Sequence, residues 1–312
     1  MPRTHRHTAH HDEGGHHPGH HSGHHPGHHS GHHPGHHPGD HGHGDAGQAE
    51  ILDLDAEVLA EHTASITAWL PLKSEPRQIV DLGSGTGAGT FALLERFPGA
   101  HVTAVDTSPG HLQRLRERAR ARGAEERVRT VRADLDAGHW PDLGTPDLVW
   151  ASASMHHMAD PGRALRNVHD LLAPGGLFAL VELAGFPRFL PAHAPESRPG
   201  LEDRAHAATD SFHAEHVPHR GADWGPMLTA AGFTVEDMRT ITVDIEGKRS
   251  EAVGRYALSS LRRIRGVAAP ALGPEDLAAL DELLDTDSPT SILRREDLAV
   301  RTERTVWAAR RA

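Results

Sequence analysis

Residues 79–90 read Ile-Val-Asp-Leu-Gly-Ser-Gly-Thr-Gly-Ala-Gly-Thr, so an acid and a run of alternating glycines follow a short β-branched stretch. After them, Phe91, Leu93 and Leu94 begin an apolar face at helical spacing. This order predicts a strand, a tight turn and a helix. Glycine permits positive φ angles and lets a ligand approach the backbone without meeting a Cβ atom. The turn is therefore predicted to hold a ligand.

Glycine-rich turns between a strand and a helix serve nucleoside triphosphates, dinucleotides and S-adenosylmethionine. No lysine follows the last glycine here, so the pattern that cradles the phosphates of a triphosphate is absent. Gly83-x-Gly85-x-x-Ala88 aligns loosely with the dinucleotide fingerprint. A nicotinamide-dependent oxidoreductase that uses the same turn is therefore an alternative.

Two further acids each follow a predicted strand. The strand at 102–105 ends in Asp106, which is suited to accept hydrogen bonds from the ribose hydroxyls of an adenosine. The strand at 128–131 is followed by Asp134, which is placed to accept from an adenine amino group. A nicotinamide enzyme would reuse the glycine turn and Asp106 but would leave Asp81 and Asp134 unexplained.

With the Leu-Ala-Pro-Gly-Gly turn at 172–176 and the strand after it, residues 50–184 resemble the class I S-adenosylmethionine-dependent methyltransferases. The resemblance implies an α/β, Rossmann-like fold with a seven-stranded, mostly parallel sheet and an antiparallel last strand. It also implies transfer of a methyl group from S-adenosylmethionine to an acceptor. The residues that it implies for cofactor binding are Asp81, Gly83, Ser84, Gly85, Gly87, Asp106, Thr107, Asp134, Leu135, Ala151 and Ser152.

Three side chains are candidates for acid-base catalysis. His156 and His157 follow a fourth predicted strand at 146–150, and Glu182 ends a fifth at 177–182. In open α/β sheets, ligands bind at the carboxyl edge of the strands, where all three are expected. Either histidine is a potential general base, and Glu182 is a potential acid-base residue. The alternative is that the histidines shape the loop or position the cofactor.

The chain divides into segments of different composition. Residues 1–47 are predicted to be a disordered tail, because His16–Gly39 repeats His-His-Pro/Ser-Gly six times without an apolar side chain. Its imidazoles are predicted to bind nickel, zinc or copper in vitro. Residues 48–312 are predicted to be the methyltransferase domain. Within it we expect one or two helices over 48–70, a core over 76–185, a lid over 186–223 and a helical insertion over 250–290.

Composition limits the partners. The chain has no cysteine and a formal net charge of −11, and the arginines at 114–122 divide between two sides of their predicted helix. Nucleic acid is therefore not expected, and a small-molecule acceptor is favoured. Apolar runs are too short to span a membrane, so we expect a cytoplasmic protein. No metal site is predicted in the folded domain. A metal-binding tail on an inactive scaffold is the non-enzyme alternative, and the acceptor and oligomeric state are left open.

Overall fold

The computed structural model describes residues 41–312, apart from the side chains of residues 41–46, Ser211 and Arg249. The histidine-rich repeat lies outside the described residues, and with it the predicted disorder and metal binding of the tail. The first helix begins at His41, so residues 41–47 are helical although the sequence assigned them to the tail.

Helices and strands alternate through the first half of the domain. The helices are α1 (His41–Val58), α2 (Ala60–Trp69), α3 (Ala88–Arg96), α4 (Pro109–Ala121), α5 (Pro161–Leu171), α6 (Leu201–His216), α7 (Trp224–Ala230), α8 (Glu251–Ala268) and α9 (Pro274–Leu284). The strands are β1 (Gln78–Leu82), β2 (His101–Asp106), β3 (Val128–Arg132), β4 (Leu148–Ser152), β5 (Leu177–Leu183), β6 (Phe233–Glu246) and β7 (Ala299–Arg311). Short 3₁₀ helices are η1 (Glu125–Arg127), η2 (Met155–His157), η3 (Gly247–Arg249) and η4 (Ile292–Arg294).

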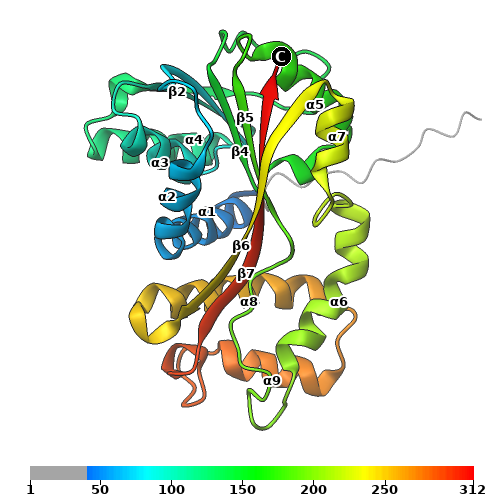
Figure 1. Ribbon diagram of the computed structural model, residues 1–312. Coiled ribbons are helices and arrows are strands. Elements are labelled where there is room, and N and C mark those ends of the chain that lie inside the picture. Colours follow the sequence, from blue (N-terminus) through cyan, green and yellow to red (C-terminus); the bar gives the residue numbers. More distant parts are fainter. Residues whose placement is uncertain (1–40) are drawn as a thin grey trace, which may run out of the picture. The chain divides into compact units, whose positions relative to one another are not determined.

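The strands form one seven-stranded sheet in the order β3-β2-β1-β4-β5-β7-β6. Neighbours among β1 to β5 pair in parallel, and β7 is antiparallel to both β5 and β6. The predicted fold class is therefore confirmed (Figure 1). Local sequence signals account for the start of α4. Ser108 caps α4 by accepting from the His111 amide, with Pro109 in the first turn.

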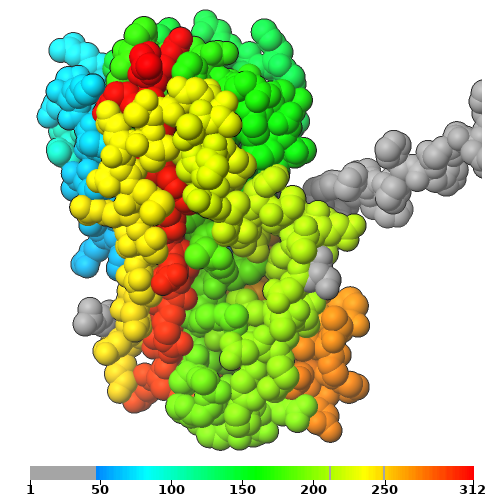
Figure 2. Space-filling view, turned by 45° about the vertical axis from the view of Figure 1, so that its right-hand side comes forward, coloured from blue at the N-terminus to red at the C-terminus, as the bar shows by residue number. Residues whose placement is uncertain are grey.

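The last two strands form a ribbon longer than the rest of the sheet. β7 pairs with β6 over 299–311 but with β5 only over 304–310, so one end of the ribbon continues past β5. Helices α8 and α9 lie between β6 and β7 in the chain, as the predicted insertion requires. Figure 2 shows the ribbon along one side of the domain, with α6 and α9 beside one end. Only residues 240–245 of β6 alternate apolar and polar side chains in the way typical of a strand. Most of the β6 residues before them are exposed and polar and show no alternation.

Three apolar clusters hold these layers together. Alternate residues of the strands enter different clusters, so Ile79 packs with the side of α2 and α3 while Val80 packs with the side of α5 and α7. The third cluster lies between α6, α8 and α9, and Leu54 and Leu59 of the N-terminal helices pack into it. We call these three helices the cap. The predicted lid at 186–223 thus contains α6, which is packed into the cap.

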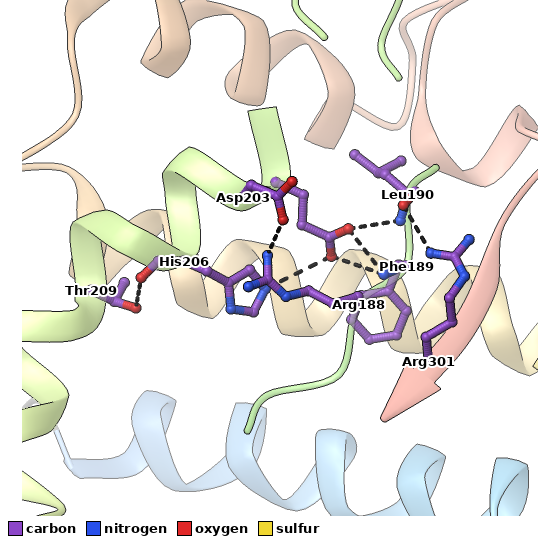
Figure 3. A network of polar contacts seen from close by, with 8 residues as sticks. Arg188, Phe189, Leu190, Asp203, His206, Thr209 and Arg301 are labelled. Atoms are coloured by element: carbon purple, nitrogen blue, oxygen red, sulfur yellow. Dashed lines mark hydrogen bonds and ion pairs between the residues drawn. The ribbon is translucent and has the colours of Figure 1, made fainter. Parts of the chain in front are cut away.

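A buried carboxylate fixes the loop that enters the cap. Glu202 of α6 accepts hydrogen bonds from the Phe189 amide at 2.9 and 3.1 Å and from the Leu190 amide at 2.8 Å. On the other side of this loop, the Arg301 guanidinium of β7 donates to the Leu190 carbonyl at 3.0 Å. Figure 3 shows Phe189 and Leu190 held between α6 and β7 in this way. The loop is therefore tied to both the cap and the sheet.

We expect Glu202→Ala to lower the free energy of unfolding by about 2–5 kcal/mol, because two buried amides lose their acceptor. The matched control is Asp203→Ala. Asp203 is the next residue and pairs with Arg188, but its side chain is 70% exposed, so its loss should cost less than about 1 kcal/mol. Urea denaturation of both variants measures the difference, and equal effects would contradict the anchoring role of Glu202.

Candidate active site

The glycine turn after β1 adopts the backbone conformation that its sequence predicts. Gly83 has φ +68°, and a Cβ atom on it would lie 2.4 Å from the Ser154 Cβ. Gly87 has φ +97° and caps α3, with Phe91 and Leu115 packed where its side chain would be. Gly87 was predicted to bind the cofactor, but it does not line the cavity described below. Its role in the structure is to end the turn and start the helix.

Asp106 at the end of β2 ties the turn in place. Its carboxylate accepts from the Gly85 amide at 2.8 Å and from the Ser108 amide at 2.9 Å. Burial acts to raise the pKa of Asp106, but hydrogen bonds from His111 and from these two amides outweigh it and hold the pKa below its ordinary value. The carboxylate is therefore ionised at neutral pH and faces the same space as the turn.

A cavity of about 970 Å³ opens at the carboxyl edge of the sheet, within the size range of ~300–1,000 Å³ typical of small-ligand sites. The predicted residues that line it are Asp81, Gly83, Ser84, Gly85, Asp106, Thr107, Asp134, Leu135 and Ser152. Ala151 does not line it, because in β4 its side chain turns into the apolar cluster on the other side of the strand from Trp150.

Other lining residues were not predicted as site residues. α1 contributes Gln48, Glu50, Ile51, Leu52 and Asp55; β4 and the loop after it contribute Trp150, Ala153, Ser154 and Met158; α8 and β7 contribute Ser259, Arg262, Arg263 and Arg304. The sequence could have predicted Trp150, because this residue lies two positions before the end of a strand and the carboxyl ends of the strands form the ligand-binding edge. The residues of α1 and α8 carry no local signal, since only tertiary packing brings these helices over the turn.

Four lining residues have a buried polar atom without a hydrogen-bond partner within the described residues. These atoms are the Gln48 Oε1, the Ser84 Oγ, the Trp150 Nε1 and the Arg304 Nε. A buried donor without a partner costs free energy, so its presence beside a cavity indicates that a ligand completes the hydrogen bond. Together with the ionised Asp106, these atoms fit a polar, partly cationic ligand such as S-adenosylmethionine.

The cavity lining contains side chains of both charges. Near the glycine turn are the carboxyls of Asp81, Asp106, Asp134 and Asp136. Helix α8 and strand β7 contribute the guanidinium groups of Arg262, Arg263 and Arg304, and the last of these is paired with Asp55 of α1.

Two of the three catalytic candidates are bound to each other away from the cavity. The His156 Nδ1 lies 2.5 Å from the Glu182 Oε2, and Oε1 of Glu182 accepts from the Met155 and His156 amides. Both side chains are 2% exposed, and neither lines the cavity. The pair holds η2 against the end of β5. This geometry favours the loop-shaping alternative for His156 and gives Glu182 the same role.

His157 differs from its neighbour because it lines the cavity. Burial lowers its pKa to about 4, and the nearby His156, Arg220 and Arg263 act in the same direction. The imidazole is therefore neutral at physiological pH. A general base titrating near the ordinary histidine value of 6.5 is consequently not expected here, because burial, and to a smaller extent the nearby positive charges, disfavour the protonated ring.

Two negative findings apply to the described part of the chain. Residues 47–312 contain no cluster of three or more histidine, aspartate or glutamate side chains that could hold a metal ion. No helix among them is both long and apolar enough to cross a membrane.

Comparison with known proteins agrees with the fold and the turn. The model of a methyltransferase domain matches residues 80–178. A trans-aconitate 2-methyltransferase of Mycolicibacterium gilvum is 32% identical over 193 residues, which cover 60% of this chain and 71% of that protein. The chain belongs to the class I S-adenosylmethionine-dependent methyltransferase family.

Similarity to other relatives is more local. A demethylmenaquinone methyltransferase of Thermus thermophilus is 39% identical over 119 residues, which cover 38% of this chain and 53% of that protein. The chain spans between 35% and 53% of the length of several such relatives. A solved structure from Bacillus halodurans, described as a methyltransferase candidate, is 18% identical with a TM-score of 0.51, covering 80% of this chain and 98% of that one. This last likeness concerns the fold alone.

Asp81 lies beneath the cavity and is 2% exposed. Burial raises its pKa from 3.8 to about 7, although the Thr90 hydroxyl donates to it at 2.6 Å. Because the folded-state pKa is the higher one, the folded protein keeps a proton that the unfolded chain releases between these pH values. The carboxyl therefore lowers the free energy of unfolding as pH rises through this window.

We expect Asp81→Asn to gain stability relative to the unmodified protein as pH rises, because asparagine does not titrate. The difference in free energy of unfolding should grow by about 1.4 kcal/mol per pH unit between about pH 4 and pH 7 and then level off. Urea denaturation at pH 5, 6, 7 and 8 measures it, and the tail histidines cancel because both proteins contain them. Parallel pH profiles would show that Asp81 is already ionised in the folded state.

His157 gives a prediction that does not need the acceptor. The imidazole resonance that disappears in His157→Gln should not shift between pH 8 and pH 5.5, because its pKa of about 4 lies below this range. Difference nuclear magnetic resonance spectra of the two proteins isolate this signal from the histidines of the tail, which should titrate near 6.5. A midpoint above pH 6 would contradict the neutral state assigned to His157.

Proposed function

We propose that this protein transfers the methyl group of S-adenosylmethionine to a small-molecule acceptor bound in the same cavity. The observation that carries the proposal is the glycine turn. It is held by Asp106 and faces a cavity in which Ser84 and Trp150 present unpaired polar atoms. S-adenosylmethionine supplies an electrophilic methyl group on a positively charged sulfur.

In this proposal the chain's own residues bind and orient. Asp106 receives the ribose hydroxyls, and Asp134 receives the adenine amino group. The acids at this end of the cavity also favour a cationic ligand by their charge. The other lining residues of the turn and of β4 contribute backbone groups and shape. Gly87 and Ala151 support this arrangement from outside the lining.

Much of the rate enhancement is expected from alignment and exclusion of water. α1 covers the turn, and its residues Ile51 and Leu52 present apolar side chains to the cavity. Asp53 of the same helix binds Arg114 at 2.6 Å and Arg118 at 2.7 Å, so α1 is fastened to α4. Arg114 and Arg118 therefore form ion pairs within the protein and are not free to bind the phosphates of a nucleic acid. This supports a small-molecule acceptor.

The names of the relatives also support a small acceptor. Those compared above are named for trans-aconitate and for demethylmenaquinone, which differ widely in chemistry. The acceptor therefore cannot be read from the family, and the cap is the part of this chain that would select it. Of the three catalytic candidates, His157 is the one that lines the cavity, so it is the one proposed to contact the ligands, as a neutral imidazole.

We expect Asp106→Asn to weaken S-adenosylmethionine binding by about 10–100-fold, because a charge-assisted hydrogen bond contributes about 1.5–3 kcal/mol. The matched control is Asp147→Asn. Asp147 also accepts from two backbone amides, those of Arg77 and Gln78, but at the opposite edge of the sheet. This control should retain its affinity for the cofactor. Calorimetric titration of each purified protein measures both effects.

The same titration separates the competing functions. The unmodified protein should bind S-adenosylmethionine and give no heat with NAD. Binding of NAD without S-adenosylmethionine would replace the proposal with the oxidoreductase alternative. Binding of zinc alone would favour a metal-binding tail on an inactive scaffold.

A further inference from the structure

Two arginines of β7 are buried to the same degree but differ in their hydrogen bonds. Arg304 and Arg310 are each 7% exposed. All three guanidinium nitrogens of Arg310 donate within the protein, to the Glu236 carboxylate and to two backbone carbonyls. Arg304 donates to the Asp55 carboxylate through Nη2, whereas its buried Nε has no hydrogen-bond partner within the described residues. The arginine with the unused donor is the one of the two that lines the cavity.

The carboxylate that pairs with Arg304 also has unused capacity. Oδ1 of Asp55 accepts from the Tyr256 hydroxyl at 2.7 Å and from the Arg304 Nη2 at 2.6 Å. Within the described residues, Oδ2 accepts from the same Nη2 alone, at 2.8 Å. A carboxylate oxygen has room for two donors, so Oδ2 can accept one more hydrogen bond. The Asp55 side chain is 23% exposed and lines the cavity, so a ligand can reach it.

The Asp55–Arg304 pair lies in the part of the cavity that the cap forms. Arg304 is paired in register with Leu183, at the carboxyl end of β5. Strands β4 and β5 lie between β1 and β7, so three strand spacings of ~4.8 Å, about 14 Å in all, separate Arg304 from the strand that carries the glycine turn. Helix α8, which supplies Tyr256 to Asp55, also supplies Ser259 to the lining. A group bound by this pair is therefore placed away from the glycine turn.

The charges of the pair select the kind of group that fits. Burial acts to lower the pKa of Arg304, but the charge of Asp55 and its hydrogen bond outweigh this and raise the pKa above its ordinary value. The guanidinium therefore stays charged and is balanced by the carboxylate. An anionic group would satisfy the Arg304 Nε but would be repelled by Asp55, and an ammonium group would leave Nε unpaired. A neutral group that both accepts and donates, as a hydroxyl or a primary amide does, satisfies both side chains.

We propose that Asp55 and Arg304 anchor the methyl acceptor by an uncharged hydroxyl or amide group, which accepts from the Arg304 Nε and donates to the Asp55 Oδ2. This inference rests on the proposed function and specifies the class of acceptor. The anchored group orients the acceptor and need not be the group that is methylated. Asp55 and Arg304 are thus specificity-determining residues, and Tyr256 is a positioning residue because it acts through Asp55.

The test uses five probes and the full chain at pH 8. Benzyl alcohol and benzamide both donate and accept, benzyl methyl ether and N,N-dimethylbenzamide accept only, and benzoate is an anion. Saturation-transfer titrations by nuclear magnetic resonance measure their affinities, with and without S-adenosylhomocysteine in the donor site. We expect benzyl alcohol or benzamide to bind about fivefold or more tightly than its methylated counterpart and than benzoate, as the loss of one hydrogen bond predicts. Which of the two binds more tightly distinguishes a hydroxyl from an amide acceptor.

Arg304→Lys keeps a cation opposite Asp55 but lacks the Nε donor, so it should bind the preferred probe about fivefold more weakly. The matched control is Arg310→Lys, on the same strand and equally buried but outside the lining, which should bind the probe as the unmodified protein does. In Asp55→Asn the amide nitrogen cannot accept a hydrogen bond, so the preference for the probe over its methylated counterpart should fall to about twofold or less. Thermal melting checks that each variant is folded. A purely structural role of the pair would change the melting temperature but not this preference.

Three results would overturn the anchoring role. Two of them need no variant: equal binding of each probe and its methylated counterpart by the unmodified protein, or tighter binding of benzoate than of benzyl alcohol and benzamide. The third is unchanged affinity for the preferred probe in Arg304→Lys. Failure of S-adenosylmethionine to bind the unmodified protein would instead overturn the proposed function. The two failures are distinguishable because the probe titrations without S-adenosylhomocysteine do not depend on binding at the donor site.

Discussion

The carboxylate of Asp55 joins the three parts of the domain that surround the cavity. It belongs to α1 and accepts from the Arg304 guanidinium of β7 at 2.6 and 2.8 Å and from the Tyr256 hydroxyl of α8 at 2.7 Å. Burial and the Asp55 charge raise the pKa of Tyr256, so its hydroxyl remains a donor. A buried ion pair adds little net stability, because desolvation offsets the attraction, but breaking it leaves a charge unpaired. Its main effect is therefore geometric: it keeps the N-terminal helix, the sheet ribbon and the cap in one arrangement around the ligand site.

That arrangement explains how one cavity presents two kinds of charge. The acids are placed by the parallel strands, whose carboxyl ends meet at one edge, so their position follows from the sheet itself. The arginines are placed by α8, which reaches this edge only because the β6–β7 ribbon extends beyond β5 and carries the cap. Under the proposed function, the core strands bind the donor and the insertion selects the acceptor. The residues for these two tasks are separated in sequence and meet at one edge of the sheet.

The sequence predicted the elements that depend on local chemistry. Ser108 and Pro109 start a helix because a hydroxyl cap and a fixed φ act within one turn, and Asp106 faces the cavity because it ends a buried strand. The sequence did not predict features that depend on contacts between residues far apart in the chain. Gly87 fits the binding motif but packs against Leu115. Arg263 lines the cavity, although no motif in its helix indicates a ligand site. Spacing identifies a turn, but only packing decides which side chains face the ligand.

The adjacent residues His156 and His157 show the same limit and lead to a chemical consequence. One ring is buried against Glu182, whereas the other lies in the cavity, where burial and nearby cations lower its pKa to about 4. A base with so low a pKa takes up protons poorly at neutral pH, so proton removal by His157 contributes little to the reaction. An acceptor whose nucleophilic oxygen is already ionised needs no such base.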